Sequence, residues 1–178
     1  MTCIVGVRTK KKVILGGDSL GTSSWSKWER NDPKVFKPER NVVMGFTTSF
    51  RMGQILQHRL DMPPVPKGVD EFEWMVVEFV PHLIKVFTEN NWIKTPNERV
   101  EGGDFIVGIN NKLFAVESDF QIHEGLNDYL AIGCGESFAE GCLFGNSHMK
   151  ARDRVVQALD AASHHSAGVG GHYTIEET

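Results

Sequence analysis

Two short apolar runs flank a basic turn in the first eighteen residues. Residues 3–8 and 12–18 are rich in valine and isoleucine, and Thr9-Lys10-Lys11 lies between them. Runs of this length and composition on either side of a short polar turn are typical of a β-hairpin. The pattern predicts a hairpin that starts almost at residue one, so that Thr2 is held by a sheet.

A polar stretch then precedes a second pair of strands. Residues 19–33 are rich in serine and glycine and contain Trp25 and Trp28, which favours a long loop. Apolar runs resume at residues 34–37 and 41–47, with a Pro-Glu-Arg turn between them. We expect a second strand pair here.

Helical periodicity follows in two segments. The residues after Thr47 keep helical spacing through about Leu60, where a proline-rich run ends the helix. From Asp70 to Phe87 apolar residues recur at i, i+3, i+4 and i+7, which predicts a buried helix. Because Pro81 lies inside this pattern, we expect the helix to be kinked or split there.

The second half of the chain repeats the order of strands and then helices, and ends on a strand. Strands are predicted at 104–109, 113–118, 129–132 and 172–176, and helices at 136–144 and 151–163. Hairpin-type connections between neighbouring strands favour antiparallel sheets with segregated helices. The predicted fold class is α+β: a four-layer αββα sandwich of two antiparallel sheets flanked by helices, in a single domain spanning residues 1–178.

Composition and charge argue against several classes of partner. The chain has 178 residues, a hydrophobic content of 40% and a formal net charge of −4, so no basic surface for nucleic acid is expected. No apolar run reaches transmembrane length, and no membrane association is expected. Cys3, Cys134 and Cys142 are odd in number and irregularly spaced, which predicts a reduced, cytoplasmic protein without disulfides, cofactor or metal.

Thr2 is the best candidate for chemistry. Once Met1 is removed, this residue supplies a hydroxyl nucleophile and an α-amine whose reference pKa of about 7.7–8.0 suits a general base near neutral pH. Asp18 ends the second predicted strand and Lys34 begins the third. Taken singly, Asp18 could merely terminate a strand and Lys34 could be solvated, but their spacing from Thr2 favours a shared site.

Several motifs along the chain carry a family resemblance. They are Thr2-Cys3-Ile4-Val5-Gly6-Val7, Val13-Ile14-Leu15-Gly16-Gly17-Asp18, Lys34-Val35, Gly45-Phe46, Leu130-Ala131-Ile132-Gly133 and Tyr173-Thr174-Ile175-Glu176-Glu177. With these motifs the chain resembles the proteasome β-subunits, which are N-terminal nucleophile hydrolases. Within that family it is most similar to the peptidase subunit of the bacterial two-component, ATP-dependent heat-shock protease.

The resemblance implies roles for three residues. Thr2 would be the nucleophile of a threonine peptidase, exposed when Met1 is removed. Lys34 would place a cation near it, which lowers the pKa of the amine and helps the hydroxyl to ionise. Asp18 would orient that lysine and offset its charge.

The resemblance also implies partners. Family members form stacked rings of identical subunits, which enclose the active sites and receive unfolded protein from an ATPase. This chain carries no P-loop, so any ATPase unfoldase would be a separate protein.

Two positions of the candidate site, Thr48 and Cys134, depart from the family pattern. Thr48 lies where the family usually has a glycine whose backbone N–H stabilises the oxyanion, although Thr47 and Thr48 are also favoured helix N-cap residues. Cys134 occupies the slot of a serine that hydrogen-bonds near the nucleophile's amine. A thiol is a weaker donor than a hydroxyl, and a lone cysteine is often only a packing residue.

A third departure lies near the C-terminus. The family has an aspartate and a serine shortly before paired glycines, whereas this chain has His164-His165-Ser166 and no acid between His164 and Gly171. Ser166 could substitute as the hydrogen-bonding partner. A metal site at the histidines is disfavoured because neighbouring residues on a helix point about 100° apart, and helix-end capping explains them better.

Two functions therefore stay open. One is an N-terminal threonine peptidase, and the other is a noncatalytic assembly protein that keeps the fold while its site has decayed. A retained Met1 would favour the second, because it blocks both the amine and the approach to Thr2. An amidase acting on a small molecule is a third possibility, which shares the nucleophile but needs a closed pocket.

Overall fold

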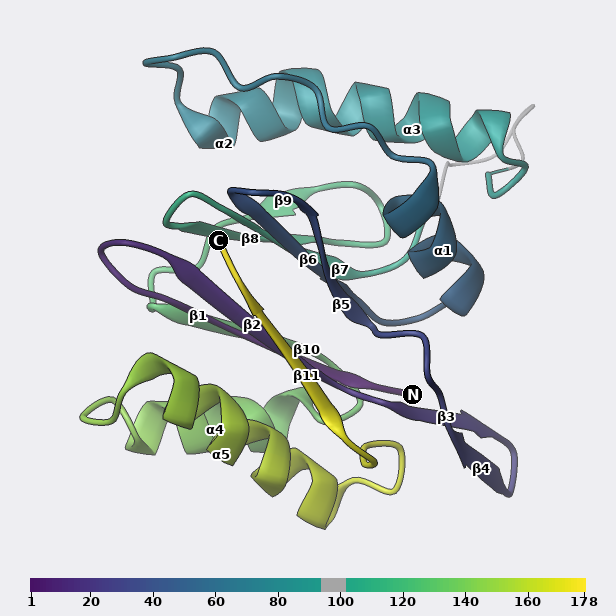
Figure 1. The fold of residues 1–178 in the computed structure, drawn as a ribbon, viewed down its shortest axis with the longest axis vertical. Coiled ribbons are helices and arrows are strands. Elements are labelled where there is room, and N and C mark those ends of the chain that lie inside the picture. Colours follow the sequence, from purple (N-terminus) through teal and green to yellow (C-terminus); the bar gives the residue numbers. More distant parts are fainter. Residues whose placement is uncertain (94–101) are drawn as a thin grey trace.

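Two antiparallel sheets lie face to face, and helices cover the outer face of each one (Figure 1). The structure is a computed structural model that describes residues 1–93 and 102–178. The layer order is helices, five-stranded sheet, four-stranded sheet, helices. The predicted αββα sandwich is confirmed.

The four-stranded sheet contains both ends of the chain, in the order β10-β1-β2-β11. Its strands are β1 (Cys3–Arg8), β2 (Val13–Asp18), β10 (Tyr129–Gly133) and β11 (Tyr173–Glu177). The other sheet has the order β5-β6-β7-β8-β9. Its strands are β5 (Val35–Glu39), β6 (Val42–Phe46), β7 (Phe105–Ile109), β8 (Lys112–Val116) and β9 (Ile122–His123), of which β9 is too short to give a sequence pattern.

Each outer face has its own set of helices. The five-stranded sheet is covered by α1 (Phe50–His58), α2 (Glu71–Trp74), the π-helical turn η1 (Met75–Phe79) and α3 (Val80–Glu89). The four-stranded sheet is covered by α4 (Glu136–Gly145) and α5 (Ala151–His165). Among the described residues, no helix combines the length and apolarity needed to cross a membrane.

The break predicted at Pro81 takes the form of a π-helical turn. The N–H of Val80 donates to the carbonyl of Met75, five residues back, and Pro81 then lies in the first turn of α3. Trp74, Met75, Phe79 and Val80 all keep α-helical backbone angles, so the helical run from 71 to 89 is continuous and the π-helical turn accommodates Pro81. The predicted interruption is therefore a π-helical turn within one helix and not a split into two helices.

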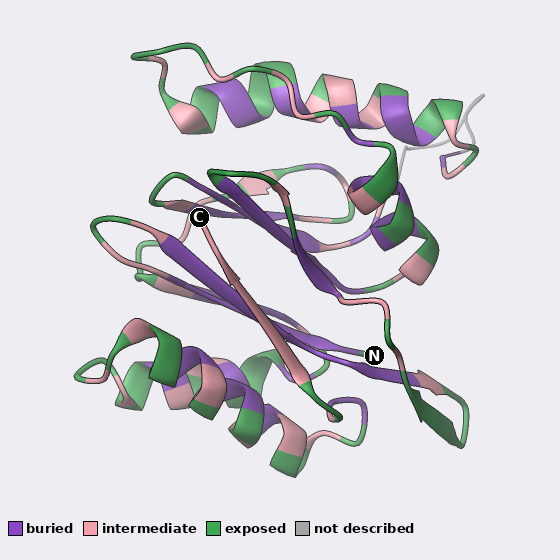
Figure 2. Ribbon diagram, in the orientation of Figure 1, coloured by how far each residue is buried: buried purple, intermediate pink, exposed green. Residues whose placement is uncertain are grey.

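Apolar side chains fill all three spaces between the layers, and the strands of both sheets are largely buried (Figure 2). Along β1, Cys3, Val5 and Val7 face α4 and α5, whereas Ile4 faces the other sheet, as the two-residue period of a strand requires. A Cβ on Gly6 would lie 2.8 Å from side-chain atoms of Leu113 and Leu15. Glycine thus lets the two sheets approach at this point.

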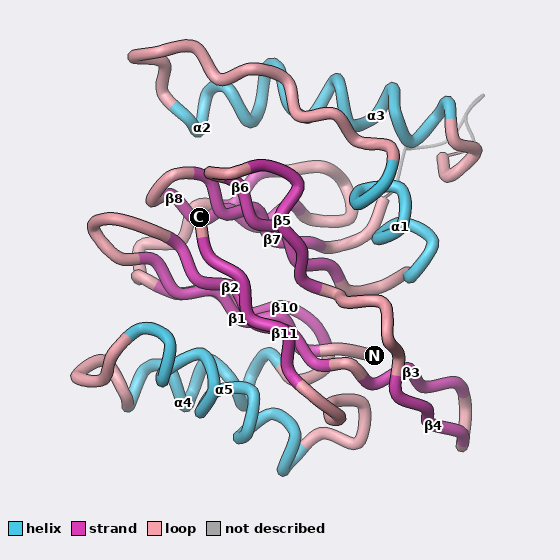
Figure 3. Tube along the Cα trace, in the orientation of Figure 1, coloured by secondary structure: helices cyan, strands magenta, loops and turns pink. Residues whose placement is uncertain are grey.

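The prediction of a long loop at residues 19–33 is wrong. The chain forms a separate hairpin of β3 (Leu20–Ser23) and β4 (Ser26–Glu29), which extends away from the body of the molecule (Figure 3). Every residue of β4 is exposed and Trp25 at the tip is 103% exposed. In β3 only Leu20 and Gly21 are buried, and β4 has no buried face, so the alternation of apolar and polar residues that reveals a strand is absent.

Candidate active site

Thr2 lies directly before β1 and is only 4% exposed, whereas Met1 is 55% exposed. The register of β1 with β10 sets Cys3 opposite Gly133, whose φ of 97° favours glycine. A side chain at Gly133 would also collide with the carbonyl oxygen of Thr2. The Thr2 hydroxyl donates to the carbonyl of Met1 at 2.5 Å, so it is held by the residue whose removal would free the α-amine.

Asp18, at the end of β2, gathers four segments of the chain around one carboxylate. Its Oδ1 accepts the N–H of Cys3 at 2.9 Å and the Nζ of Lys34 at 3.0 Å. Its Oδ2 accepts the N–H of Leu20 at 3.1 Å and the N–H of Gly170 at 3.2 Å. The residue after Thr2 is therefore fixed directly to the carboxylate that binds the lysine.

Lys34 lies in the interior, directly before β5. The side chains of Lys34 and Asp18 are both 0% exposed, and the Lys34 Nζ also donates to the carbonyl of Leu20 at 2.7 Å. Burial lowers the pKa of Lys34, and the neighbouring Asp18 opposes that shift. The alternative in which Lys34 is a solvated side chain is wrong.

Cys134 and Ser166 meet on another side of the Thr2 backbone. The Cys134 Sγ donates to the carbonyl of Thr2 at 3.5 Å. The Ser166 Oγ lies 3.4 Å from the carbonyl oxygen of Cys134 and 3.5 Å from its Sγ. A Cβ on Gly168 would lie 2.5 Å from the Cβ of Met1 and 2.6 Å from the Cys134 Sγ. These residues thus surround the first peptide unit of the chain.

Thr48 has a backbone conformation that a β-branched residue rarely adopts. Its φ is +68°, in the left-handed region that favours glycine. Its Oγ1 accepts the N–H of Asp104 at 3.3 Å, while its own N–H has no hydrogen-bond acceptor among the described residues. Such an N–H is available to a ligand.

The loop that carries Thr48 lies close to Thr2. The Oγ1 of Thr47 would be 3.2 Å from a Cβ on Gly133, the glycine that touches the Thr2 carbonyl. The N-cap of α1 is Ser49, whose side chain accepts the N–H of Met52 at 3.4 Å. The interpretation of Thr47 and Thr48 as helix caps is therefore wrong.

Sequence reasoning missed two contributors to the site. Ser19 is buried, and its Oγ accepts the N–H of His172 at 2.9 Å, which ties the end of β2 to the start of β11. Gly170 donates its backbone N–H to Asp18. The glycine-rich run from Gly168 to Gly171 gave only a turn signal, because a backbone donor leaves no mark on the residue type.

The remaining histidines and tryptophans are spread apart. The rings of His164 and His165 lie at 87° to each other at the end of α5, while the ring of His172 is 3.4 Å from Glu29. Within the described part of the chain, no three His, Cys, Asp or Glu side chains group closely enough to hold a metal ion. Trp74 is a core residue, and Trp28 lines a hollow of about 460 Å³ together with Ser166 and Gly170.

The fold places the chain in a recognisable structural class. It has the fold of HslV and of other proteasome-like proteins, so the resemblance seen in the sequence is confirmed for the fold. No family model matches the sequence.

Three solved structures define this likeness. BPH of Thiobacillus denitrificans, solved in complex with epoxomicin, has a TM-score of 0.80 and 18% identity over 99% of this chain and 98% of that chain. HslV of Trypanosoma brucei has a TM-score of 0.71 and 19% identity over 99% of this chain and 98% of that one. A Gly-1 mutant of Anbu from Hyphomicrobium sp. strain MC1 has a TM-score of 0.69 and 14% identity over 98% and 80% of the two chains. At such identities the likeness concerns the fold alone.

Proposed function

We propose that this protein is a threonine-type peptidase in which Thr2 becomes the nucleophile after removal of Met1. The observation that carries the proposal is the fully buried Lys34–Asp18 pair, which is hydrogen-bonded to the N–H of Cys3. Burying two charges is expensive, and a buried ion pair is weak evidence for a role in stability. A buried cation whose carboxylate partner binds the residue next to a potential nucleophile is better explained by chemistry.

The proposed reaction is acyl transfer in two stages. The Thr2 Oγ attacks the carbonyl carbon of a peptide bond, and the α-amine of Thr2 takes the hydroxyl proton, directly or through water, and passes it to the leaving amine. This gives an ester between Thr2 and the acyl part of the substrate. Water then attacks the ester, the amine again carries the proton, and a free carboxylic acid leaves.

The other site residues would support these steps. The Lys34 cation favours the neutral amine and the ionised hydroxyl, and Asp18 holds that cation in place. The free N–H of Thr48 is the proposed oxyanion donor, a contribution of about 2.7–4 kcal/mol in related acyl transfers. Cys134 and Ser166 would orient the α-amine once the first peptide unit is gone.

The likeness to HslV supports a proposal about assembly. Identical subunits would form a ring or a double ring in the cytoplasm, with the Thr2 sites facing an enclosed chamber. A separate ATPase would deliver unfolded protein or peptide to this chamber, since the chain has no nucleotide-binding loop of its own.

A noncatalytic assembly protein is the second candidate. It is favoured by the left-handed conformation of Thr48 and by the lack of an acid between His164 and Gly171. In that case the buried pair would persist only as a structural remnant. The two candidates differ in whether Thr2 can ever react.

Intact-mass spectrometry of the purified protein tests the proposal. We expect loss of the Met1 mass and a single covalent adduct with epoxomicin, the ligand of the BPH structure. Thr2→Ala should lose the adduct, whereas Thr88→Ala, an exposed control on α3, should keep it.

A second preparation separates incomplete processing from a decayed site. A cleavable leader that leaves Thr2 as the first residue supplies the free amine regardless of how Met1 is processed. If this protein forms no adduct and hydrolyses no peptide, the peptidase proposal fails and the assembly role is favoured. Negative-stain images of the same sample test the ring, and a monodisperse monomer would contradict both candidates.

A further inference from the structure

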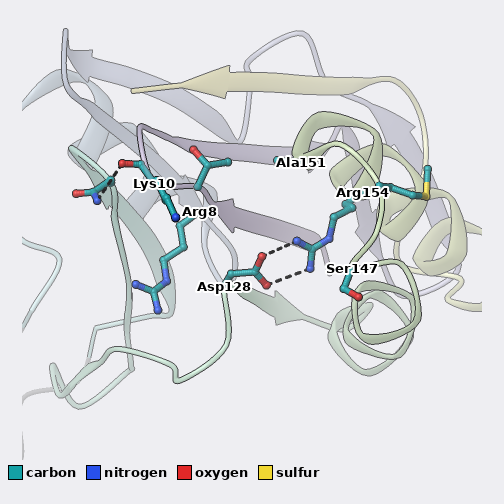
Figure 4. Close-up of a pocket in the computed structure, with 9 residues that line it drawn as sticks. Arg8, Lys10, Asp128, Ser147, Ala151 and Arg154 are labelled. Atoms are coloured by element: carbon teal, nitrogen blue, oxygen red, sulfur yellow. Dashed lines mark hydrogen bonds and ion pairs between the residues drawn. The ribbon is translucent and has the colours of Figure 1, made fainter.

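A second hollow lies at the far end of β1 from Thr2 (Figure 4). Its volume is about 500 Å³, within the range of small-molecule sites. Residues that line it include Arg8, Lys10, Asp128, Ser147, Ala151 and Arg154. Arg8 and Thr2 are six residues apart on an extended strand, or roughly 20 Å at about 3.3 Å per residue, so the hollow is separate from the candidate active site.

Cations outnumber carboxylates on the walls of this hollow. Arg154 is 3% exposed and its guanidinium donates to both carboxylate oxygens of Asp128, at 2.6 and 3.1 Å (Figure 4). This pairing holds the pKa of Asp128 below its usual range, so the carboxylate is ionised and already neutralised by Arg154. Arg8 and Lys10 are left as the excess positive charge.

Neither of these two cations is committed to a close partner. The nearest carboxylate to Arg8 is that of Glu124, at 3.9 Å, and Glu124 is bound more closely by Lys112 at 2.8 Å. The side chain of Lys10 is exposed and makes no ion pair with any described residue. The Arg8 and Glu124 side chains are partly exposed, at 30% and 22%, and a contact as long as theirs stabilises little, so an anion of higher charge can displace it.

The opposite wall supplies uncharged hydrogen-bond donors. Helix α5 begins at Ala151, and its N-cap Lys150 makes no side-chain hydrogen bond to the first turn. The N–H groups of Ala151, Arg152 and Asp153 have no acceptor among the described residues, and the helix dipole there favours an anion. Ser147, in the turn between α4 and α5, also lines the hollow (Figure 4), while the acidic residue of the first turn, Asp153, is exposed and does not line it.

We propose that this hollow binds a small molecule that carries a phosphate group. The phosphate oxygens would take donors from Arg8 and Lys10 on one wall and from Ser147 and the start of α5 on the other. Donors on two sides suit the several oxygens of a phosphate better than the two of a carboxylate. Met149 and Ala151 would contact the apolar part of the same ligand.

Calorimetric titration with inorganic pyrophosphate tests this site. We expect saturable binding, weakened about tenfold or more by Arg8→Met and again by Lys10→Met, because each removes a charge-assisted hydrogen bond. The matched controls are Arg40→Met and Lys67→Met, two exposed cations outside the hollow, which should bind as the parent protein does. Thr2→Ala should also bind normally, so this proposal can fail or stand independently of the peptidase.

Three outcomes would overturn the proposal. They are the absence of saturable binding, unchanged binding in the Arg8→Met/Lys10→Met double variant, and equal affinity for succinate, which would show that phosphate is not selected. Circular dichroism of each variant excludes misfolding as the cause of a loss. Adenosine monophosphate in a parallel titration tests whether an attached organic group adds affinity through Met149.

Discussion

The buried pair of Asp18 and Lys34 gives a sharp test of how this site is held together. Both side chains are 0% exposed and their charged atoms are 3.0 Å apart. Asp18→Asn leaves the Lys34 cation in the interior without its counter-charge, which costs about 3–5 kcal/mol in comparable buried pairs. Lys34→Met should cost less, because Asp18 keeps three backbone donors, the N–H groups of Cys3, Leu20 and Gly170.

Urea unfolding at neutral pH, followed by circular dichroism and tryptophan fluorescence, measures these differences. A loss of about 3 kcal/mol lowers the unfolding midpoint by at least about 1 M for slopes of about 1–3 kcal/mol/M. The double variant Asp18→Asn/Lys34→Met should lose less than the sum of the two single losses, since no lone charge is left buried.

An exposed pair on α3 provides the control. Lys85 and Glu89 are 4.0 Å apart and 71% and 62% exposed, so Glu89→Gln should cost no more than about 0.5 kcal/mol. If Asp18→Asn were as mild as Glu89→Gln, or if the double variant lost the full sum, the interior pair would not be the structural support described above.

Three further predictions concern other contacts near the two sites. Thr48→Gly should be more stable than Thr48→Ala by about 1–2 kcal/mol in urea unfolding. Both variants lose the side-chain hydrogen bond, but a φ of +68° strains alanine and not glycine. At a site with negative φ, alanine would be the more stable of the two. Gly133→Ala should abolish labelling of Thr2 and lower the melting temperature, since its Cβ collides with the Thr2 carbonyl; normal labelling would refute that placement. The stabilisation from the Asp128–Arg154 pair should be fully present above the usual carboxyl pKa of 3.8 and be lost as the pH falls through the lower folded-state pKa. The difference in unfolding free energy between the parent and Asp128→Asn should therefore shrink between pH 6 and pH 3. A difference that stays constant over this range would contradict the prediction.

The sequence was most informative where an element is buried. The apolar run of β1 and the helical period of α3 both follow from the need to bury apolar side chains, so the layers of the sandwich could be predicted. The hairpin β3–β4 could not, because all four residues of β4 are exposed and only the first two of β3 are buried, which is too short an apolar pattern to reveal a strand.

The site was predictable only in part for a similar reason. Thr2, Asp18 and Lys34 could be grouped by spacing and family resemblance, and in the structure the Asp18 carboxylate binds both Lys34 and the N–H of Cys3, the residue after Thr2. The contribution of Gly170 is a backbone N–H, which any residue type could supply, so its identity carried no signal. The burial of Lys34 depends on packing between both sheets, which local patterns do not describe.

The contact between Asp18 and Gly170 also limits the order in which the chain can fold. Asp18 and one of its four hydrogen-bond donors, the N–H of Gly170, lie 152 residues apart in the sequence. Strand β11, which completes the sheet next to β2, follows Gly170 and is also synthesised long after β2. The surroundings of Thr2 therefore cannot be completed until the segment that contains Gly170 has left the ribosome.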